Sequence, residues 1–282
     1  MKYFTRILLL CLSITACSKP ASDRHTDGRF KAVSLGPALT EQIFLLNAGS
    51  NLAADTSYCV RPQAAVRITN IGDLLRINIE LIYKLKPDIV LATGLTRPEN
   101  ITRLKQLGLK VKVFPMPSSF KEICSQFREL GTIFDKKKKA HAVITECRDE
   151  LKRITNQTGK LPLKTVFFQI GDKPLYGAAA NSYLHQYILF SGCCNVLRHK
   201  KSGAYSYEKL LQTDPDIIIT TLMGMQKEDV LAKWYQFKSL QAVKKNNILI
   251  VDQYEACSSN PVTFIKTLKK IASFSHKQEL NL

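Results

Sequence analysis

A gapless internal repeat constrains the fold of this chain of 282 residues more than any other feature. The segment Asn78–Thr93 (NIELIYKLKPDIVLAT) is echoed at Ser206–Thr221 (SYEKLLQTDPDIIITT). Each copy predicts a short helix, a Pro-Asp break and an apolar strand, because proline lacks an N–H and restricts the residue before it. The apolar runs suit parallel strands that are buried on both faces. Such units also recur by chance in α/β proteins, but the shared register favours duplication and therefore two similar lobes.

The order of predicted elements gives the fold class. Strands and helices alternate on both sides of an uninterrupted helical stretch at 135–156, which contains neither Gly nor Pro. At ~1.5 Å per residue this helix is over roughly 30 Å long, enough to cross from one lobe to the other. We therefore predict two three-layer α/β lobes with mainly parallel sheets, joined by one long rigid helix. The predicted boundaries are an N-terminal lobe at 31–134, a linking helix at 135–157 and a C-terminal lobe at 158–282.

The N-terminus predicts export. Lys2 and Arg6 precede the apolar run 7–14, which is too short to span a bilayer as a mature helix. A positive start followed by a short apolar run is typical of a secretory leader. We predict a signal peptide at 1–16.

The residues around the predicted cleavage site indicate a lipid anchor. The string ITAC at 14–17 resembles the lipobox of bacterial lipoproteins, in which the leader is cut before a cysteine that carries lipid. A plain signal peptide with a coincidental cysteine is the alternative. We predict lipidation, including palmitate, at Cys17, and a flexible tether at 17–30 because this stretch is polar and contains Pro and Gly. The mature protein is then expected on the extracytoplasmic side of a bacterial membrane.

The remaining cysteines permit disulfides in an exported chain. They are Cys59, Cys124, Cys147, Cys193, Cys194 and Cys257. Cys124 and Cys147 lie on two consecutive predicted helices, at similar distances from the turn between them. We predict a disulfide for this pair, while the other connectivities stay open. The spacings fit no zinc motif of the paired CxxC type.

Charge and motifs exclude several classes of function. The formal net charge of +18 favours anionic partners, but the lysines are dispersed and no nucleic-acid motif accompanies them. No catalytic motif is present. The histidines lack ligand spacing, and we expect them at the surface: His25, His141, His185, His199 and His276. We therefore predict no nucleic-acid partner, no enzyme activity, no cofactor and no metal site built from protein side chains.

Several segments together resemble the periplasmic binding proteins for cobalamin and ferric siderophores. They are VSLGPALTEQIFLLNAG (33–49), DTSYCVRPQ (55–63), IGDLLRINIELIYKLKPDIVLA (71–92), SYEKLLQTDPDIII (206–219) and the predicted helix that begins at Pro261. The most specific parts are the S-x-x-P-x-x-T-E opening, which ends at Glu41, and the two repeat units. The resemblance covers nearly the whole mature chain. It implies a monomeric, ligand-capturing subunit of an ABC importer.

The resemblance also implies a docking pair. Members of that family present an acidic residue on each lobe to arginines of a permease dimer, and the matching positions here are Glu80 and Glu208. Two carboxylates can each form a two-pronged charged contact with Arg. The other explanation is that both side chains complement the N-termini of their helices.

The ligand of such proteins lies between the lobes. By family position, the expected cleft residues are Tyr58, Leu74, Tyr176, Tyr205 and Tyr254. Aromatic walls suit a planar macrocycle or a catecholate ligand. Where cobalamin binders place a tryptophan, this chain has Leu74, and its single tryptophan is Trp234.

Two cysteines follow the cleft tyrosines closely. Cys59 comes directly after Tyr58, and Cys257 comes three residues after Tyr254. Either they pack locally or form a disulfide with Cys193 or Cys194, or both thiols approach the cleft and contact the metal or macrocycle.

The sequence as a whole predicts a lipid-anchored binding protein that captures a metal chelate and delivers it to an ABC permease dimer. A corrinoid or a ferric siderophore is the first expectation for the ligand, followed by haem. The rigid linking helix predicts only a small hinge motion. An exported lipoprotein enzyme or an adhesion module on the same scaffold is the alternative.

Overall fold

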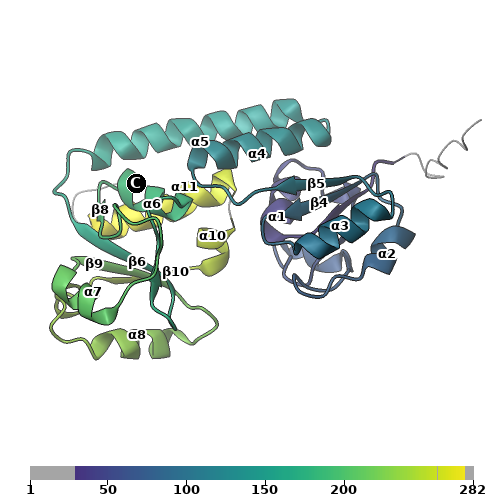
Figure 1. Cartoon of the computed structure of the whole chain (residues 1–282). Helices are drawn as coiled ribbons and strands as arrows, with labels where there is room; N and C mark the ends of the chain where they lie inside the picture. The colour runs from purple at the N-terminus through teal and green to yellow at the C-terminus, as the bar shows by residue number, and fades with distance from the viewer. Residues whose placement is uncertain (1–28, 259, 277–282) are drawn as a thin grey trace, which may run out of the picture.

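The computed structural model describes residues 29–258 and 260–276 and contains two α/β halves, each built on one sheet (Figure 1). We call residues 29–117, with the first sheet, the N-half, and residues 159–258 and 260–276, with the second sheet, the C-half. The predicted leader, the predicted lipidation site Cys17, His25 and nearly all of the tether lie outside the described residues. No helix in the described part of the chain is long and apolar enough to cross a membrane. The predicted α/β class with mainly parallel sheets is confirmed.

The first sheet is entirely parallel, in the order β3-β2-β1-β4-β5. Its strands are β1 (Ala32–Ser34), β2 (Leu52–Asp55), β3 (Thr69–Asn70), β4 (Ile89–Thr93) and β5 (Val111–Phe114). Its connections contain α1 (Pro37–Leu45), η1 (Gly49–Asn51), η2 (Gln63–Arg67), α2 (Ile79–Lys84) and α3 (Pro98–Gln106). Since all five strands are parallel, their carboxyl ends meet at one edge of the sheet.

The second sheet has the order β10-β9-β6, and both β7 and β8 pair with β6. Its strands are β6 (Thr165–Gly171), β7 (Tyr176–Gly177), β8 (Cys194–Asn195), β9 (Ile217–Thr221) and β10 (Ile248–Val251). Only the two-residue β7 runs antiparallel to its neighbour. The helices of this half are α6 (Tyr183–Phe190), α7 (Tyr207–Thr213), α8 (Lys227–Tyr235), α9 (Gln241–Lys244), α10 (Gln253–Cys257) and α11 (Pro261–Ser275).

The two copies of the sequence repeat adopt the same local structure. The first forms α2 and β4, the second forms α7 and β9, and the elements begin at equivalent positions. Each helix is capped in the same way, because Asn78 Oδ1 accepts the N–H of the third helical residue and Ser206 Oγ does so in the second copy. Each strand then pairs in parallel with the first strand of its own half, β1 or β6.

The aspartate of the Pro-Asp break has the same role in both halves. Asp88 accepts a hydrogen bond from the backbone N–H of Lys31 at 2.7 Å, just before β1. Asp216 accepts one from the backbone N–H of Thr165 at 2.8 Å, at the start of β6, and a second from the Thr165 hydroxyl at 2.8 Å. Both carboxylates therefore fix the start of the neighbouring strand.

Two long helices connect the sheets. They are α4 (Phe120–Ile133) and α5 (Lys137–Thr158), and they lie side by side across both halves (Figure 1). The linking helix predicted at 135–156 is thus confirmed as a helix, displaced by two residues at each end. The N-terminal lobe predicted at 31–134 includes α4, yet the residues of α4 also pack against α11 of the C-half.

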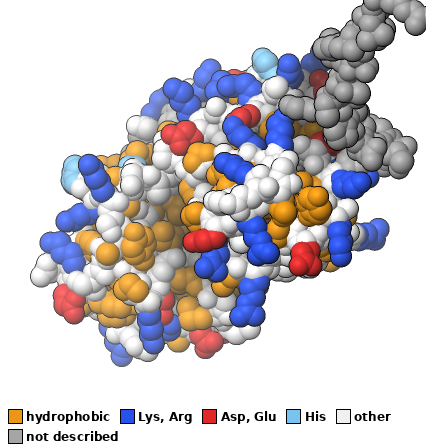
Figure 2. Space-filling view, turned by 45° about the vertical axis from the view of Figure 1, so that its right-hand side comes forward, with side chains coloured by type: hydrophobic (Ala, Val, Ile, Leu, Met, Phe, Trp, Pro, Cys, Tyr) orange, Lys and Arg blue, Asp and Glu red, His pale blue; other side chains and the backbone are white. Residues whose placement is uncertain are grey.

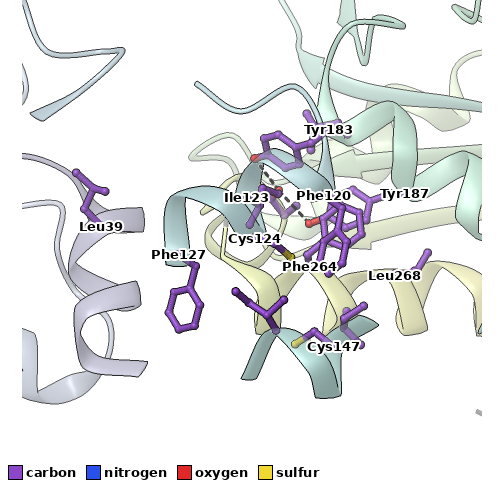
Figure 3. Packing of buried hydrophobic residues seen from close by; sticks show 14 of the residues in the cluster. Leu39, Phe120, Ile123, Cys124, Phe127, Cys147, Tyr183, Tyr187, Phe264 and Leu268 are labelled. Carbon is purple, nitrogen blue, oxygen red and sulfur yellow. Dashed lines mark hydrogen bonds between the residues drawn. The ribbon is translucent and has the colours of Figure 1, made fainter. Parts of the chain in front are cut away.

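One hydrophobic cluster runs through these helices and both halves. In Figure 3, Phe120 of α4 lies near Phe264 of α11 and Tyr187 of α6, and Phe127 of the same cluster lies on the side toward Leu39. The rings of Tyr187 and Phe264 stack with centroids 4.4 Å apart. The same cluster includes Leu39 of α1 in the N-half. This shared core fixes the orientation of the two sheets.

The predicted disulfide is not formed in this structure. Cys124 on α4 and Cys147 on α5 carry free, buried thiols. Burial raises the pKa of Cys124 to about 11 and that of Cys147 to about 12. Both side chains are part of the hydrophobic cluster, where a cysteine serves as a small apolar group.

The expectation of surface histidines is wrong for His276, which is 1% exposed. Its Nε2 lies 2.9 Å from the carbonyl oxygen of Ser191, which satisfies one ring nitrogen inside the protein. His185 is half-buried, and its Nδ1 lies 2.9 Å from Asn195 Nδ2. His141 and His199 are exposed, as expected.

We predict that Asp216→Ala lowers the free energy of unfolding by about 2 kcal/mol and Asp88→Ala by about 1 kcal/mol, since hydrogen bonds to a charged acceptor are worth about 1.5–3 kcal/mol and Asp88 is more exposed. Urea denaturation of each variant measures this. Asp149→Ala, at an exposed position of α5, controls for the loss of one negative charge. A larger loss for Asp88→Ala than for Asp216→Ala would contradict this account of the repeat.

Candidate ligand-binding site

A cavity of about 400 Å³ lies between the N-half and the C-half. The N-half contributes residues at or just after the ends of three strands, which are Gly36, Thr93 and Phe114. The C-half contributes Ile170 and Thr221 near the ends of β6 and β9. In open α/β sheets, ligands bind outside the carboxyl ends of the strands, and here two such edges share one cavity. Figure 2 shows hydrophobic side chains along a recess between the two parts of the molecule.

The close approach of the β1–α1 turn to β4 depends on Gly36. A Cβ atom added to this glycine would lie 2.5 Å from Cγ2 of Thr93, so a larger residue would push the turn away from the end of β4. Pro37 follows at the start of α1, where its missing N–H is not needed. The turn and the first residues of α1 thereby form one wall of the cavity.

The wall of the cavity is apolar, aromatic and sulfur-rich. Among the described residues that line it, none carries a charged side chain. Sulfur atoms come from Met116, Met223 and Cys257, and the amides come from Gln42, Gln126 and Gln253. Such a wall favours binding by surface contact and ring stacking rather than by ion pairing. Within residues 29–258 and 260–276, no three His, Cys, Asp or Glu side chains gather to hold a metal ion.

The backbone of Met223 is held in an unusual conformation at this wall. Its φ is 49°, which lies in the left-handed region. Residues other than Gly, Asn and Asp rarely adopt this conformation. Gly224 follows with a φ of 80°. Backbone strain of this kind concentrates at ligand-contacting positions, and Met223 lines the cavity.

Three of the five predicted cleft residues line the cavity. Tyr58, in the segment that follows β2, is 49% exposed, and Leu74 and Tyr254 complete the set. The guanidinium carbon of Arg61 lies 5.2 Å from the centroid of the Tyr254 ring, so a cation covers one side of this tyrosine.

The other two predicted cleft residues are placed elsewhere. Tyr205 stacks on Phe167 with ring centroids 5.6 Å apart, and its hydroxyl lies 2.8 Å from that of Thr213. Tyr176 lies in β7 at the edge of the second sheet and is 38% exposed. Neither of them is among the residues that line the cavity.

The two predicted cleft thiols differ in position. Cys257 is exposed and lines the cavity, and its apolar surroundings raise its pKa to about 11. It is therefore a neutral thiol at physiological pH. Cys59 is 3% exposed, is not among the lining residues, and accepts a hydrogen bond from Thr40 Oγ1 at 3.2 Å.

The two glutamates of the repeat lie on the surface, away from the cavity wall. Glu80 is in the first turn of α2 and Glu208 in the first turn of α7, and both are exposed. The two helices lie at opposite outer ends of the molecule (Figure 1). Hydrogen bonding to its own backbone N–H and to Ser206 lowers the pKa of Glu208.

Several residues of the cavity wall were not predicted from the sequence. Met116, Met223 and Gln253 were missed, although each follows shortly after a strand. Parallel strands place the residues after their carboxyl ends at a common edge of the sheet. The position of these residues just after a strand could therefore have identified them as cavity residues. The sequence motif that ends at Glu41 was noticed only as part of the resemblance, yet Glu41 is buried at a contact between the two halves.

The sequence matches a known family over most of its length. The family described as "Periplasmic binding protein" matches residues 33–255. The vitamin B12-binding protein of Yersinia pseudotuberculosis serotype O:1b (strain IP 31758) is 23% identical over 230 residues, which is 80% of this chain and 79% of that protein.

Solved structures share the fold. A periplasmic haem-binding protein from Pseudomonas aeruginosa has a TM-score of 0.80 at 20% identity, over 89% of this chain and 94% of that one. A periplasmic vitamin B12-binding protein of Vibrio cholerae has a TM-score of 0.74 at 20% identity, over 88% of this chain and 96% of that one. The extent of the family match, together with a cavity set between two parallel α/β sheets, leads to one conclusion: the chain belongs to the periplasmic binding protein family.

Proposed function

We propose that this protein captures a planar metal macrocycle between its two halves and delivers it to an ABC permease. The observation that carries the proposal is the uncharged, apolar cavity at the strand ends of both sheets, with Tyr58 and Tyr254 in its wall. Rings of this kind stack on flat conjugated ligands. Relatives named for vitamin B12 and haem bring both macrocycles into consideration.

The lack of charged side chains among the described lining residues distinguishes between the candidate ligands. A ferric siderophore that surrounds its iron with anionic oxygens would carry its charge into a cavity whose described lining has no cation. A macrocycle presents large apolar faces instead. We therefore rank a haem or a corrinoid above a ferric siderophore, which changes the order expected from the sequence.

The size of the cavity separates the two macrocycles. A volume of about 400 Å³ is near the lower end of the range of small-molecule sites. A flat haem fits this space with less rearrangement than a corrinoid, whose nucleotide arm adds bulk. The net charge of +18 would also attract the carboxylates of a haem from a distance. Haem is thus the first candidate and a corrinoid the second.

We predict that ferric haem binds the purified protein, that cobalamin binds more weakly, and that a hexadentate ferric catecholate siderophore does not bind. Absorbance titration and thermal shift with each compound measure this. Binding of the siderophore alone would contradict the proposal, since no described lining residue could neutralise its charge.

Tyr58→Ala and Tyr254→Ala should each weaken haem binding by about threefold to tenfold, because a stacked aromatic contact contributes about 0.5–1.5 kcal/mol. Tyr176→Ala is the matched control, since this tyrosine is exposed but does not line the cavity. Titration of the three variants under identical conditions compares them. Equal losses in all three would place the ligand elsewhere.

We further propose that the Cys257 thiol contacts the bound macrocycle as a neutral group. Bound haem should then slow the alkylation of Cys257 by about tenfold, because a ligand that fills the cavity covers this exposed thiol. Mass spectrometry of the labelled peptides follows the reaction, with buried Cys59 as the internal reference. An unchanged rate at Cys257 in the presence of saturating haem would contradict the contact.

We propose that Glu80 and Glu208 dock onto the permease, as the family resemblance implies, and an apolar group beside each glutamate supports this role. An exposed apolar side chain lies three residues after each glutamate, Tyr83 at 52% and Leu211 at 39% exposure. Residues three apart share a helix face, so each repeat presents a carboxylate beside an apolar group. Two matched patches on one chain suit a partner with two equivalent receptors, such as a permease dimer.

Charge reversal at both positions (Glu80→Lys with Glu208→Lys) should abolish transport in a reconstituted system while ligand affinity stays within about twofold, because neither residue lines the cavity. The matched control reverses Glu99 and Glu228, which are also exposed and lie in the first turns of α3 and α8. Loss of ligand affinity, or an equal loss of transport in the control, would show that the pair has been misassigned.

The wider assignment follows from this function. We propose a monomer on the extracytoplasmic side of a bacterial membrane, anchored through lipidated Cys17, with the lobe boundaries predicted from the sequence. An exported lipoprotein enzyme or an adhesion module stays the alternative, without a cavity residue that favours it.

A further inference from the structure

Two polar contacts join the N-half directly to the C-half beside the cavity. Asn260 Nδ2 donates a hydrogen bond to Glu41 Oε2 at 2.9 Å. Arg61 Nη2 donates one to Asp252 Oδ2 at 3.0 Å. Glu41 and Asn260 are buried, whereas the second pair is more accessible. The buried pair is the stronger constraint, because a buried polar group that loses its partner is costly.

Both contacts end on residues that cap helices of the C-half. Asp252 Oδ1 accepts the backbone N–H of Glu255 at 2.9 Å and so caps α10. Asn260 Oδ1 accepts the backbone N–H of Thr263 at 2.9 Å and so caps α11. The N-half therefore holds the short helix α10 near its beginning and just beyond its end.

This helix and the residue that follows it form part of the C-half wall of the cavity. Gln253, Tyr254, Cys257 and Ser258 all line it. On the opposite side, Gln42 of α1 lines the cavity next to Glu41 in the sequence. The cavity wall on α10 and the buried interhalf contact are thus parts of one short segment.

We propose that the Glu41–Asn260 hydrogen bond is a positioning device for ligand capture, which sets the distance between α1 and the α10 wall of the cavity. Glu41 is then a positioning residue and does not itself contact the ligand. The effect of this contact on ligand capture rests on the proposed function. Its effect on the stability of the protein can be measured without any ligand.

The surroundings of Glu41 make this device sensitive to pH. Glu41 is 8% exposed, and burial raises its pKa to about 7. The hydroxyl of Ser258, the positive charge of Arg61 and the amide of Asn260 favour the carboxylate, and Asp252 opposes it. On the side of α5, Lys139 lines a second hollow together with Glu41 and Arg61.

The sign of the pH effect follows from the raised pKa. In the unfolded chain Glu41 has the ordinary value of 4.5, and in the folded chain it has a value of about 7. Between these two values the folded protein holds a proton that the unfolded protein has released, so stability falls as pH rises through this window. Above the folded value both states are ionised, and the stabilisation from this proton is fully lost. Movement that exposes Glu41 to water would lower its pKa in the same way, so closure around a ligand should also weaken as pH rises.

The test uses Glu41→Gln, which keeps the shape and an oxygen that accepts from Asn260 but cannot ionise. Asp55→Asn is the matched control, since burial also raises the pKa of Asp55 to about 7, but Asp55 lies at the end of β2 within the N-half. Thermal unfolding and haem titration are measured for the full chain and both variants between about pH 5.5 and about pH 8.5. The thiol of Cys257 does not titrate in this range.

We expect haem affinity of the wild-type protein to fall by about threefold to tenfold over this range, within the limit of tenfold per pH unit for one proton. Glu41→Gln should remove this fall in affinity and also the part of the pH dependence of stability that comes from Glu41. Asp55→Asn should remove a similar part of the pH dependence of stability but leave the fall in affinity unchanged. Glu41→Ala should weaken haem binding at every pH.

Two results would overturn the inference. One is a Glu41→Gln variant whose haem affinity keeps the wild-type pH dependence, and the other is an Asp55→Asn variant that loses it. Haem binding by the wild-type protein tests the proposed function separately. Binding without any difference between the two variants would overturn this inference alone, whereas absence of binding to haem and cobalamin would overturn both.

Discussion

The relation between the two halves depends on one hydrophobic cluster that crosses from one sheet to the other. Helices α4, α5 and α11 pack together, and their cluster includes Ile89 of the first sheet and Ile219 of the second. Burial of apolar surface is the main favourable term in folding, and here it fixes the relation between the two halves as well as their interiors. The strand ends of both sheets face a shared cavity because this core holds them there.

A rigid frame of this kind suits a binding protein that changes little on capture. A hinge needs residues that can absorb a change in backbone angles, and α5 is one continuous helix of 22 residues beside the 14 residues of α4. Outside this frame, two polar contacts join the halves beside the cavity, Glu41 with Asn260 and Arg61 with Asp252. Control of the opening is therefore expected at these contacts rather than in the helices.

The long-range organisation could be predicted from the sequence because it depends on strong local patterns. A helix of three or more turns without Gly or Pro, and a repeat with a fixed Pro-Asp break, leave few alternatives. The weak strands were missed for the opposite reason. The stretch 51–77 contains β2 and the two-residue β3, whose few residues show too little periodicity to indicate a strand.

Side-chain environments were predicted less well than elements. Family position could not tell whether a tyrosine turns toward the cavity, and Tyr205 is instead held against Phe167 by core packing. His276 is buried because the fold supplies the carbonyl of Ser191, which is distant in the sequence. Glu41 was visible within a motif, but its partner Asn260 lies at the far end of the chain. Such pairs depend on tertiary contacts that no local pattern specifies.

A crystal structure of the protein with bound haem would test the central claim most directly. Our account predicts the macrocycle in the cavity, in contact with Tyr58 of the N-half and Tyr254 of the C-half, with α5 unchanged. A haem bound to one half alone, or in the outer hollow lined by Glu41 and Lys139, would contradict it.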